Sequence, residues 1–245
     1  MAVTLNNLGM IAQNTGDYTG AREYYEQALA SAMELGHKLG VSVNLGILGN
    51  VASDIGDYAA ARDYFDRALA INRELGHQIA EAGCLLNIGI TEQETGDLPM
   101  AHAHYDQALS IYRELNNRLG QAEVLLAQGI LEMRESQYVH AKQLLQEVIA
   151  IGLELKLTPI LIQPIEASGS LFCATTCFKL AAQLLGAAQS ARKILQVPLP
   201  PSKVAGVERD HEACRIALGN AEYERCITEG ASLTLEEAAK LVLSN

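Results

Sequence analysis

The sequence contains no tryptophan and only three phenylalanines in 245 residues. Hydrophobic residues still make up 49% of the chain, which is enough to bury a sizeable core. Alanine, leucine and glycine are abundant. The composition therefore favours helices that pack closely through small side chains.

Basic residues are also scarce, because 18 Lys and Arg stand against 29 Asp and Glu and give a formal net charge of −11. A field of this sign repels nucleic acid phosphates and anionic membranes. We therefore expect no direct nucleic acid partner and no membrane partner.

Long apolar runs are absent too. No stretch of about 18 consecutive apolar residues occurs, and no basic segment leads into an apolar run at the N-terminus. These absences predict neither a membrane span nor a signal peptide, and the expected location is cytoplasmic. Five cysteines are too few for the dense disulfide framework of small secreted domains, so we expect buried thiols in helices.

What the chain does contain is a repeat with a period of 40 residues. Four copies keep one register without a slip, and a weaker fifth copy keeps the phase at Ile165, Gly169, Ala181 and Leu185. The recurring positions are Leu5, Leu45, Leu85 and Leu125; Gly9, Gly49, Gly89 and Gly129; Ala21, Ala61, Ala101 and Ala141; and Tyr25, Phe65, Tyr105 and Leu145.

Each copy has the pattern of two helices. Leu5, Leu8 and Ala12 share a face at helical spacing in the first, and Ala21 and Tyr25 do so in the second. Stacking such hairpins buries faces that no single hairpin can bury. The sequence therefore predicts an all-α fold, a right-handed superhelix (α-solenoid) of stacked helix hairpins with a concave inner surface.

The turns between the helices also recur. Gly16 can adopt the left-handed conformation that ends the first helix, and Asp17 can cap the second. Gly36 can end the second helix, and Asn116 takes that place in the third copy.

Glycine inside a helix costs about 1 kcal/mol relative to alanine, so its recurrence needs a reason in the packing. We expect Gly9 and Ala21 to mark the contact between paired helices. The large residues Tyr25, Phe65 and Tyr105 are expected to fill the space between adjacent hairpins.

Beyond the repeats, the segment 197–201 is rich in proline and predicts a loop. A helix is expected over 202–217, followed by a short helix after Gly219 and Asn220, and by a last helix that starts at Thr234 with Glu237 completing a capping box. The expected division is four repeat units over 1–155, a degenerate fifth unit over 156–196 and C-terminal capping helices over 197–245.

The pattern Leu8-Gly9, Gly16-Asp17-Tyr18, Ala21, Tyr25 and Ala28 resembles the tetratricopeptide repeat. The period exceeds the usual ~34 residues, so the chain is similar to the longer variant of kinesin light chains and signalling ATPases. The tetratricopeptide repeat normally has an aromatic residue early in its first helix, where this chain has leucine. A later aromatic position of the repeat is occupied here by Ala12 or Ala52. This resemblance implies an array that binds a protein segment in its concave groove.

The tail carries a second resemblance. Leu184-Leu185-Gly186-Ala187-Ala188, Pro198-Leu199-Pro200-Pro201, Glu222-Tyr223, Glu229-Gly230 and Leu235-Glu236-Glu237-Ala238 resemble the C-terminal end of large bacterial regulators. In those proteins a signal-transduction ATPase of the STAND type (NB-ARC or LuxR-type) precedes a tetratricopeptide array. The resemblance implies that this chain is the sensor end of such a protein.

No catalytic constellation is found in the sequence. It lacks a phosphate-binding loop, a Gly-x-Ser-x-Gly elbow and a His-Glu-x-x-His pair. The spacing of Cys173, Cys177, Cys214 and Cys226 is not that of a zinc module. We therefore expect no enzyme activity, no catalytic residue, no cofactor and no metal site.

Two further groups have ordinary explanations. His102 and His104 are two residues apart and point about 200° apart on a helix, so we expect surface or groove residues. Glu236 and Glu237 suit the N-terminal end of a helix dipole.

The remaining functional surface is the concave face, formed largely by first helices. Amide side chains there offer donors and acceptors to a peptide backbone, and apolar ones add contact area. These inward positions of the first three repeats contain no Lys or Arg, so recognition of an acidic C-terminal tail is not expected. The predicted binding residues are Asn6, Asn7, Met10, Gln13, Asn50, Ser53, Asn87, Ile90, Gln93 and Glu123.

The leading functional prediction is a regulatory module that binds a protein segment or an inducer. Two alternatives remain open: a sensor that binds a small-molecule inducer inside the superhelix, and a free-standing scaffold that self-assembles as a homo-oligomer through the tail helices.

Overall fold

The computed structural model describes residues 2–245, which form thirteen α-helices, one short 3-10 helix and no strand. The all-α prediction and the hairpin arrangement are confirmed. Within residues 2–245 no helix is long and apolar enough to cross a membrane. The α-helices are α1 Ala2–Asn14, α2 Tyr18–Glu34, α3 Lys38–Asp54, α4 Tyr58–Leu75, α5 Gln78–Thr95, α6 Leu98–Glu114, α7 Arg118–Arg134, α8 Tyr138–Leu155, α9 Ile162–Ala174, α10 Phe178–Leu195, α11 Pro201–Leu218, α12 Asn220–Ala231 and α13 Leu235–Ser244.

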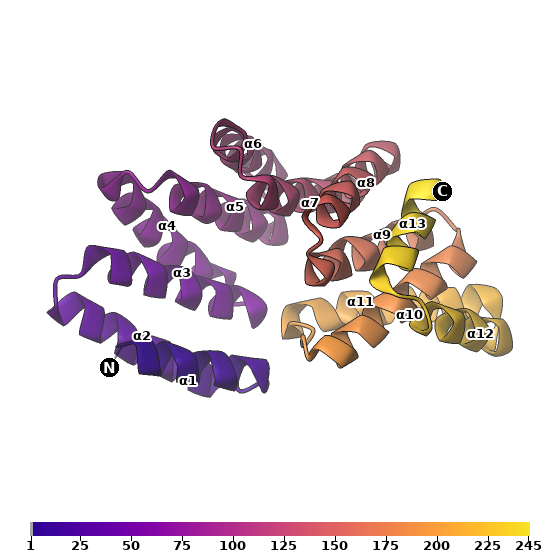
Figure 1. Cartoon of the computed structure of the whole chain (residues 1–245), viewed down its shortest axis with the longest axis horizontal. Helices are drawn as coiled ribbons and strands as arrows, with labels where there is room; N and C mark the ends of the chain where they lie inside the picture. Colours follow the sequence, from indigo (N-terminus) through magenta and orange to yellow (C-terminus); the bar gives the residue numbers. More distant parts are fainter. Residues whose placement is uncertain (1) are drawn as a thin grey trace. The chain divides into compact units, whose positions relative to one another are not determined.

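Two compact units make up the chain. Of the described residues, 2–117 and 200–202 form the N-terminal unit, and 118–199 and 203–245 form the C-terminal unit. In the N-terminal unit, α1 pairs with α2, α3 with α4 and α5 with α6 (Figure 1). The hairpins stack in chain order, because α2 packs against α3 and α4 packs against α5.

The turns inside the hairpins follow from the recurring glycine and aspartate. Asp17 accepts a hydrogen bond from the backbone N–H of Gly20, and Asp57 and Asp97 cap α4 and α6 in the same way. Before Asp57 the chain reverses at Gly56, whose φ is +83°. The predicted role of Asn116 is also confirmed, since its φ is +51° at the end of the third hairpin.

The glycines inside the first helices receive a large side chain from their own hairpin. A Cβ placed on Gly9 would lie 2.7 Å from the ring of Tyr25, and one on Gly89 would lie 2.6 Å from the ring of Tyr105. The predicted contact between paired helices at Gly9 is confirmed. The expectation that these rings fill the space between hairpins is corrected, because each glycine leaves a hollow that the ring of the paired helix enters.

In the C-terminal unit, α7 pairs with α8 and α9 pairs with α10. A 3-10 helix over Thr158–Leu161 leads into α9. The helix α12 then packs along α10, while α13 packs against α8, α9 and α10 (Figure 1). The predicted capping box is confirmed, since Thr234 and Glu237 exchange hydrogen bonds at the start of α13. The helices α8 to α13 share one core, which includes Ile165, Leu184, Leu185, Cys214 and Val242.

Candidate partner-binding face

The predicted binding residues of the first three repeats lie on α1, α3 and α5 of the N-terminal unit. Asn7, Met10 and Asn50 are exposed, and Asn87 and Ile90 are half-buried. Amide groups therefore alternate with apolar side chains on the accessible part of three successive first helices. We call this set, Asn7, Met10, Asn50, Asn87 and Ile90, the amide row.

Two side-chain hydrogen bonds connect the first helices directly. The Asn87 Nδ2 group donates to Asn50 Oδ1 at 3.2 Å, which joins α5 to α3. The Gln13 Nε2 group donates to Asp54 Oδ2 at 3.0 Å, which joins α1 to α3. The structure therefore brings predicted binding residues from consecutive hairpins side by side.

Other predicted residues are less accessible. Ser53 is half-buried, and Asn6 is half-buried with a buried Oδ1 that has no hydrogen-bond partner. Gln93 is a correction: only 3% of the residue is exposed, and its Oε1 accepts a 2.9 Å hydrogen bond from the Tyr105 hydroxyl. Gln93 fixes the ring that fills the hollow at Gly89, so it is a packing residue and is not available to a partner.

Glu123 belongs to α7 of the C-terminal unit and is exposed to solvent. The surrounding protein nevertheless removes part of its hydration, and this desolvation raises the pKa of the Glu123 carboxyl above its ordinary value. A cationic or hydrogen-bond-donating partner would stabilise the ionised form that this desolvation disfavours.

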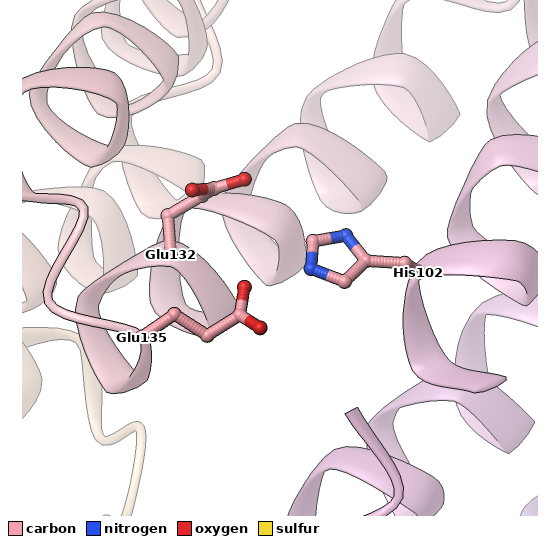
Figure 2. A group of neighbouring side chains, drawn as sticks. All are labelled: His102, Glu132 and Glu135. Atoms are coloured by element: carbon pink, nitrogen blue, oxygen red, sulfur yellow. The ribbon is translucent and has the colours of Figure 1, made fainter. Parts of the chain in front are cut away.

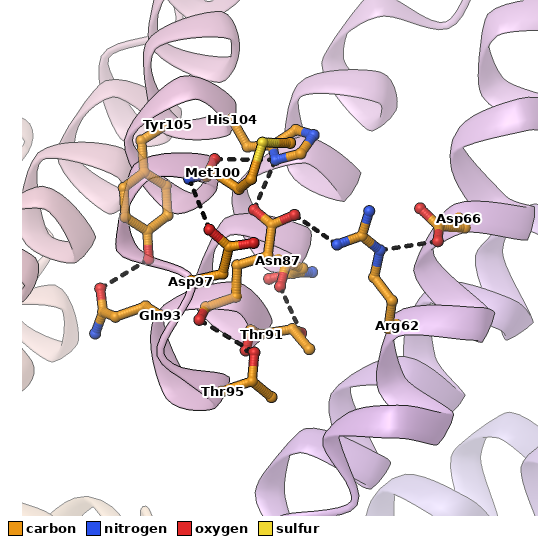
Figure 3. A network of polar contacts seen from close by, with 11 residues as sticks. Arg62, Asp66, Asn87, Thr91, Gln93, Thr95, Asp97, Met100, His104 and Tyr105 are labelled. Carbon is orange, nitrogen blue, oxygen red and sulfur yellow. Dashed lines mark hydrogen bonds and ion pairs between the residues drawn. The ribbon is translucent and has the colours of Figure 1, made fainter.

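The sequence did not predict an ion network on α4, α5 and α6 that has a buried carboxylate at its centre (Figure 3). Glu92 is 5% exposed, and its Oε1 accepts a hydrogen bond of 2.5 Å from Arg62 Nη1. Its Oε2 lies 2.7 Å from His104 Nδ1. Arg62 also donates to Asp66 at 2.8 Å. The expectation that His104 is an ordinary surface or groove residue is corrected, because its ring lies against a buried carboxylate that needs polar partners.

The repeat itself contains the signal that would have revealed this network. The positions that correspond to Glu92 in the first two copies are Ala12 and Ala52, and both are buried. An acidic residue at a position that is small and buried elsewhere requires a partner. The same position in the fourth copy is Glu132, which lies 3.1 Å from His140 Nδ1. Figure 2 shows Glu132 in the last turn of α7 and Glu135 directly after the end of that helix.

A second group of polar side chains lies between α9, α11 and α12 of the C-terminal unit. Ser170 Oγ donates to Asp210 Oδ2 at 2.5 Å, and His211 Nδ1 lies 2.8 Å from the Tyr223 hydroxyl. Burial raises the pKa of Asp210 and lowers the pKa of His211. The prediction of buried thiols is confirmed for Cys84, Cys173, Cys214 and Cys226, and it is wrong for Cys177, which is exposed before the start of α10.

The folded-state pKa of His211 makes a test of this group possible. Burial holds that pKa below its usual value of 6.5, with Asp210 and Glu166 opposing and Arg215 reinforcing the shift. Protonation therefore favours the unfolded chain, and the stability that neutral His211 contributes is lost as the pH falls through 6.5. We expect the variant His211→Gln to lose less stability than the wild type between pH 7.5 and 5.5 in urea unfolding monitored by circular dichroism.

The control for this experiment is His37→Gln, which replaces an exposed histidine at the start of α3. Asp210 has the opposite effect on the pH dependence of stability, because its raised pKa makes the free energy of unfolding fall as the pH rises through the acidic range. Both variants retain Asp210. Equal pH slopes for His211→Gln and the wild type would show that His211 is not held neutral by the fold.

Comparison with known proteins agrees with this architecture. The profile of the tetratricopeptide repeat matches residues 1–74 and 81–154. No curated protein matches the chain. Among solved structures, BtubC (BKLC) from P. vanneervenii is similar in fold, with 20% identity over 80% of this chain and 81% of that chain and a TM-score of 0.57. A TPR repeats protein from Bacteroides fragilis NCTC 9343 aligns with 17% identity over 100% of this chain and 98% of that chain, with a TM-score of 0.35.

The two matched segments cover more than half of the chain and contain the glycine, alanine and aromatic positions whose contacts build the hairpins. The chain therefore belongs to the tetratricopeptide repeat family.

Proposed function

We propose that this chain is a non-catalytic interaction module that binds a segment of a partner protein on its first helices. Tetratricopeptide repeats generally mediate protein–protein interaction. The observation that carries the proposal is the amide row, which crosses three hairpins and remains accessible to solvent.

The chemistry of the amide row suits a polypeptide ligand. Asn50 and Asn87 each have both a donor and an acceptor, and an extended or helical segment presents the matching groups of its backbone and side chains. Their hydrogen bond to each other uses one donor and one acceptor and leaves further capacity for a ligand. Met10 and Ile90 supply apolar contact area beside the amides.

Site-specific photo-crosslinking tests this proposal. A photoreactive amino acid placed at Asn50 is expected to capture a discrete protein in the native host, whereas one at Ala70, an exposed position on the second helix α4, is expected to capture none. The variant Asn87→Arg should reduce capture at position 50 by about tenfold, because the new side chain removes an amide and blocks its neighbour. Equal capture at both positions, or none at position 50, would remove the basis of the proposal.

We further propose that the module is the regulatory part of a signalling ATPase or transcriptional regulator. The support is the resemblance of the segments Leu184–Ala188 and Leu235–Ala238 to the end of such regulators. The open reading frame that encodes this chain tests the idea, because an in-frame phosphate-binding loop upstream is expected. A stop codon directly upstream would contradict it, and the search would then turn to separate partner proteins.

A further inference from the structure

In the C-terminal unit, the helix α11 lies on one face of the first helix α9. Ser170 Oγ of α9 donates to Asp210 Oδ2 of α11 at 2.5 Å, and Cys173 Sγ of α9 donates to the backbone carbonyl of Asp210 at 3.8 Å. One turn further along α11, Cys214 is buried and belongs to the same core as Cys173. Ser170 and Cys173, which we call the α9 pair, therefore hold a helix on this face.

The rotation of α9 in its hairpin is the same as that of the earlier first helices. A Cβ on Gly169 would lie 3.0 Å from the side chain of Leu185 on the paired helix, and a Cβ on Gly49 of α3 would likewise overlap the ring of Phe65. Gly169 and Gly49 occupy the same position of the 40-residue repeat. Because this position faces the paired helix in both hairpins, the residues that follow the two glycines lie on equivalent faces of α9 and α3.

The helix α3 of the N-terminal unit has two residues that match the α9 pair. In the register of the repeat, Asn50 corresponds to Ser170 and Ser53 corresponds to Cys173. Asn50 is exposed and Ser53 is half-buried. We call Asn50 and Ser53 the α3 pair. Among the first three hairpins, only α3 combines a hydrogen-bond donor at the first position with a small side chain at the second, because α1 and α5 have Met or Ile followed by Gln.

The chemistry of the α3 pair also matches that of the α9 pair. Asn87 Nδ2 donates to Asn50 Oδ1, so the group that Asn50 presents to a ligand is its Nδ2 donor. Ser170 likewise donates to the carboxylate of α11. Ser53 has a hydroxyl donor where α9 has a thiol donor of similar size.

We propose that the α3 pair binds an amphipathic helix of a partner protein in the way that the α9 pair binds α11. This proposal rests on the proposed function and specifies its ligand. The ligand helix carries a side-chain oxygen acceptor, as α11 does at Asp210, and a small apolar side chain four residues later, as α11 does at Cys214. The helix α11 has three basic and three acidic side chains, so a helix of this composition is not repelled by a net charge of −11.

A peptide of residues 201–218 is the probe, because it contains the whole of α11. The full chain, labelled at isoleucine methyl groups, is titrated with this peptide by NMR under reducing conditions. We expect the methyl signals of Ile47 on α3 and Ile90 on α5 to shift, while the signal of Ile71, a half-buried residue of the second helix α4, stays in place. Peptide concentrations in the millimolar range also reveal a weak complex.

Variants of the protein and of the peptide provide the controls. Asn50→Leu is expected to weaken binding by about tenfold, because it removes the donor that faces the acceptor of the helix. Gln107→Leu, the loss of an exposed amide on α6, should change the affinity by less than about twofold. The peptide with Asp210→Leu should bind about tenfold more weakly. The peptide with Ala213→Pro should not bind, because proline interrupts the helix, whereas an extended ligand would tolerate it.

Four outcomes would overturn the proposal. The first is the absence of shifts at Ile47 and Ile90 at millimolar peptide, and the second is equal binding of the Ala213→Pro peptide. The third is a shift confined to Ile216 of α11, which would show that the peptide replaces α11 on the α9 pair. The fourth is a shift of Ile47 and Ile90 on raising the protein concentration without peptide, which would identify α11 of a second copy as the occupant.

Photo-crosslinking at position 50 separates this proposal from the proposed function. Capture of a host protein together with no peptide binding would refute the helical ligand and leave the interaction module in place. Absence of capture at position 50 would remove the interaction module itself.

Discussion

Replacing Gly230 with alanine is expected to lower the free energy of unfolding by about 3 kcal/mol. A Cβ at this position would lie 2.6 Å from the carbonyl carbon of Gln183 and 2.7 Å from its Cα, so the clash is with backbone. No side-chain rotation can relieve such an overlap, and the two helices would have to separate.

The contact between α10 and α12 is reciprocal, which is why the expected effect is large. A Cβ on Gly186 of α10 would in turn overlap the backbone carbonyl of Ile227 on α12. Gly230 of α12 thus lies against the backbone of Gln183, and Gly186 of α10 lies against the backbone of Ile227. In each helix the contacted residue is three positions before the glycine. This arrangement allows the backbones to touch and buries Tyr223 and Cys226 of α12 against α10.

Urea unfolding and thiol reactivity measure the effect. In Gly230→Ala, Cys226 should react faster with a thiol reagent, because the loosened α12 exposes a side chain that is otherwise buried. Gly206→Ala in α11 is the control, since a Cβ there meets only the end of the Arg209 side chain at 3.8 Å. This control is expected to leave stability unchanged or to raise it by up to ~1 kcal/mol. A Gly230→Ala variant as stable as the control would show that α12 tolerates displacement.

The second large effect is expected for Arg62→Met, which should lower the free energy of unfolding by about 2 kcal/mol. The variant keeps the length of the side chain but leaves the buried Glu92 carboxylate with His104 alone. Loss of one member of a buried pair usually costs more. The smaller figure is expected here because the Arg62 side chain is 38% exposed, so solvent already screens part of the interaction.

The repeat supplies a control at the same position of the first hairpin. Arg22 lies 40 residues earlier and pairs with Glu26 on its own exposed helix face, so Arg22→Met should cost less than about 0.5 kcal/mol. Adding Glu92→Met to Arg62→Met should restore most of the lost stability, because an apolar side chain needs no counter-charge. Chemical denaturation of the four proteins tests both statements, and equal losses in Arg22→Met and Arg62→Met would argue against a special role for the network.

Most of the fold could be read from the periodicity of the sequence. Helix pairing, the turns at Gly56 and Asn116 and the capping box at Thr234 all depend on short-range rules, and each recurs or has a local signature. The corrected role of Tyr105 has a different origin. Helical spacing places this residue on the buried face of its helix, but it does not determine against which neighbouring helix the ring packs.

The candidate site was predicted less completely, for the same reason. Helical spacing placed Asn50 and Asn87 at inward positions of first helices, but the hydrogen bond between them was not predicted. It could not separate Gln93, which is turned into the hairpin to hold Tyr105, from the residues that remain accessible. A rotation of a fraction of a turn decides between the two surroundings, and only packing sets that rotation.

By itself, then, the sequence determined the helices, their pairing in hairpins and their 40-residue register, because backbone conformation and amphipathic spacing are local properties that repeat. Tertiary structure alone decided that Arg62 and His104 contact the buried Glu92 carboxylate and that glycines let α10 and α12 touch. These features join residues on different helices, whose distances depend on how the helices pack and not on the order of residues within any one of them.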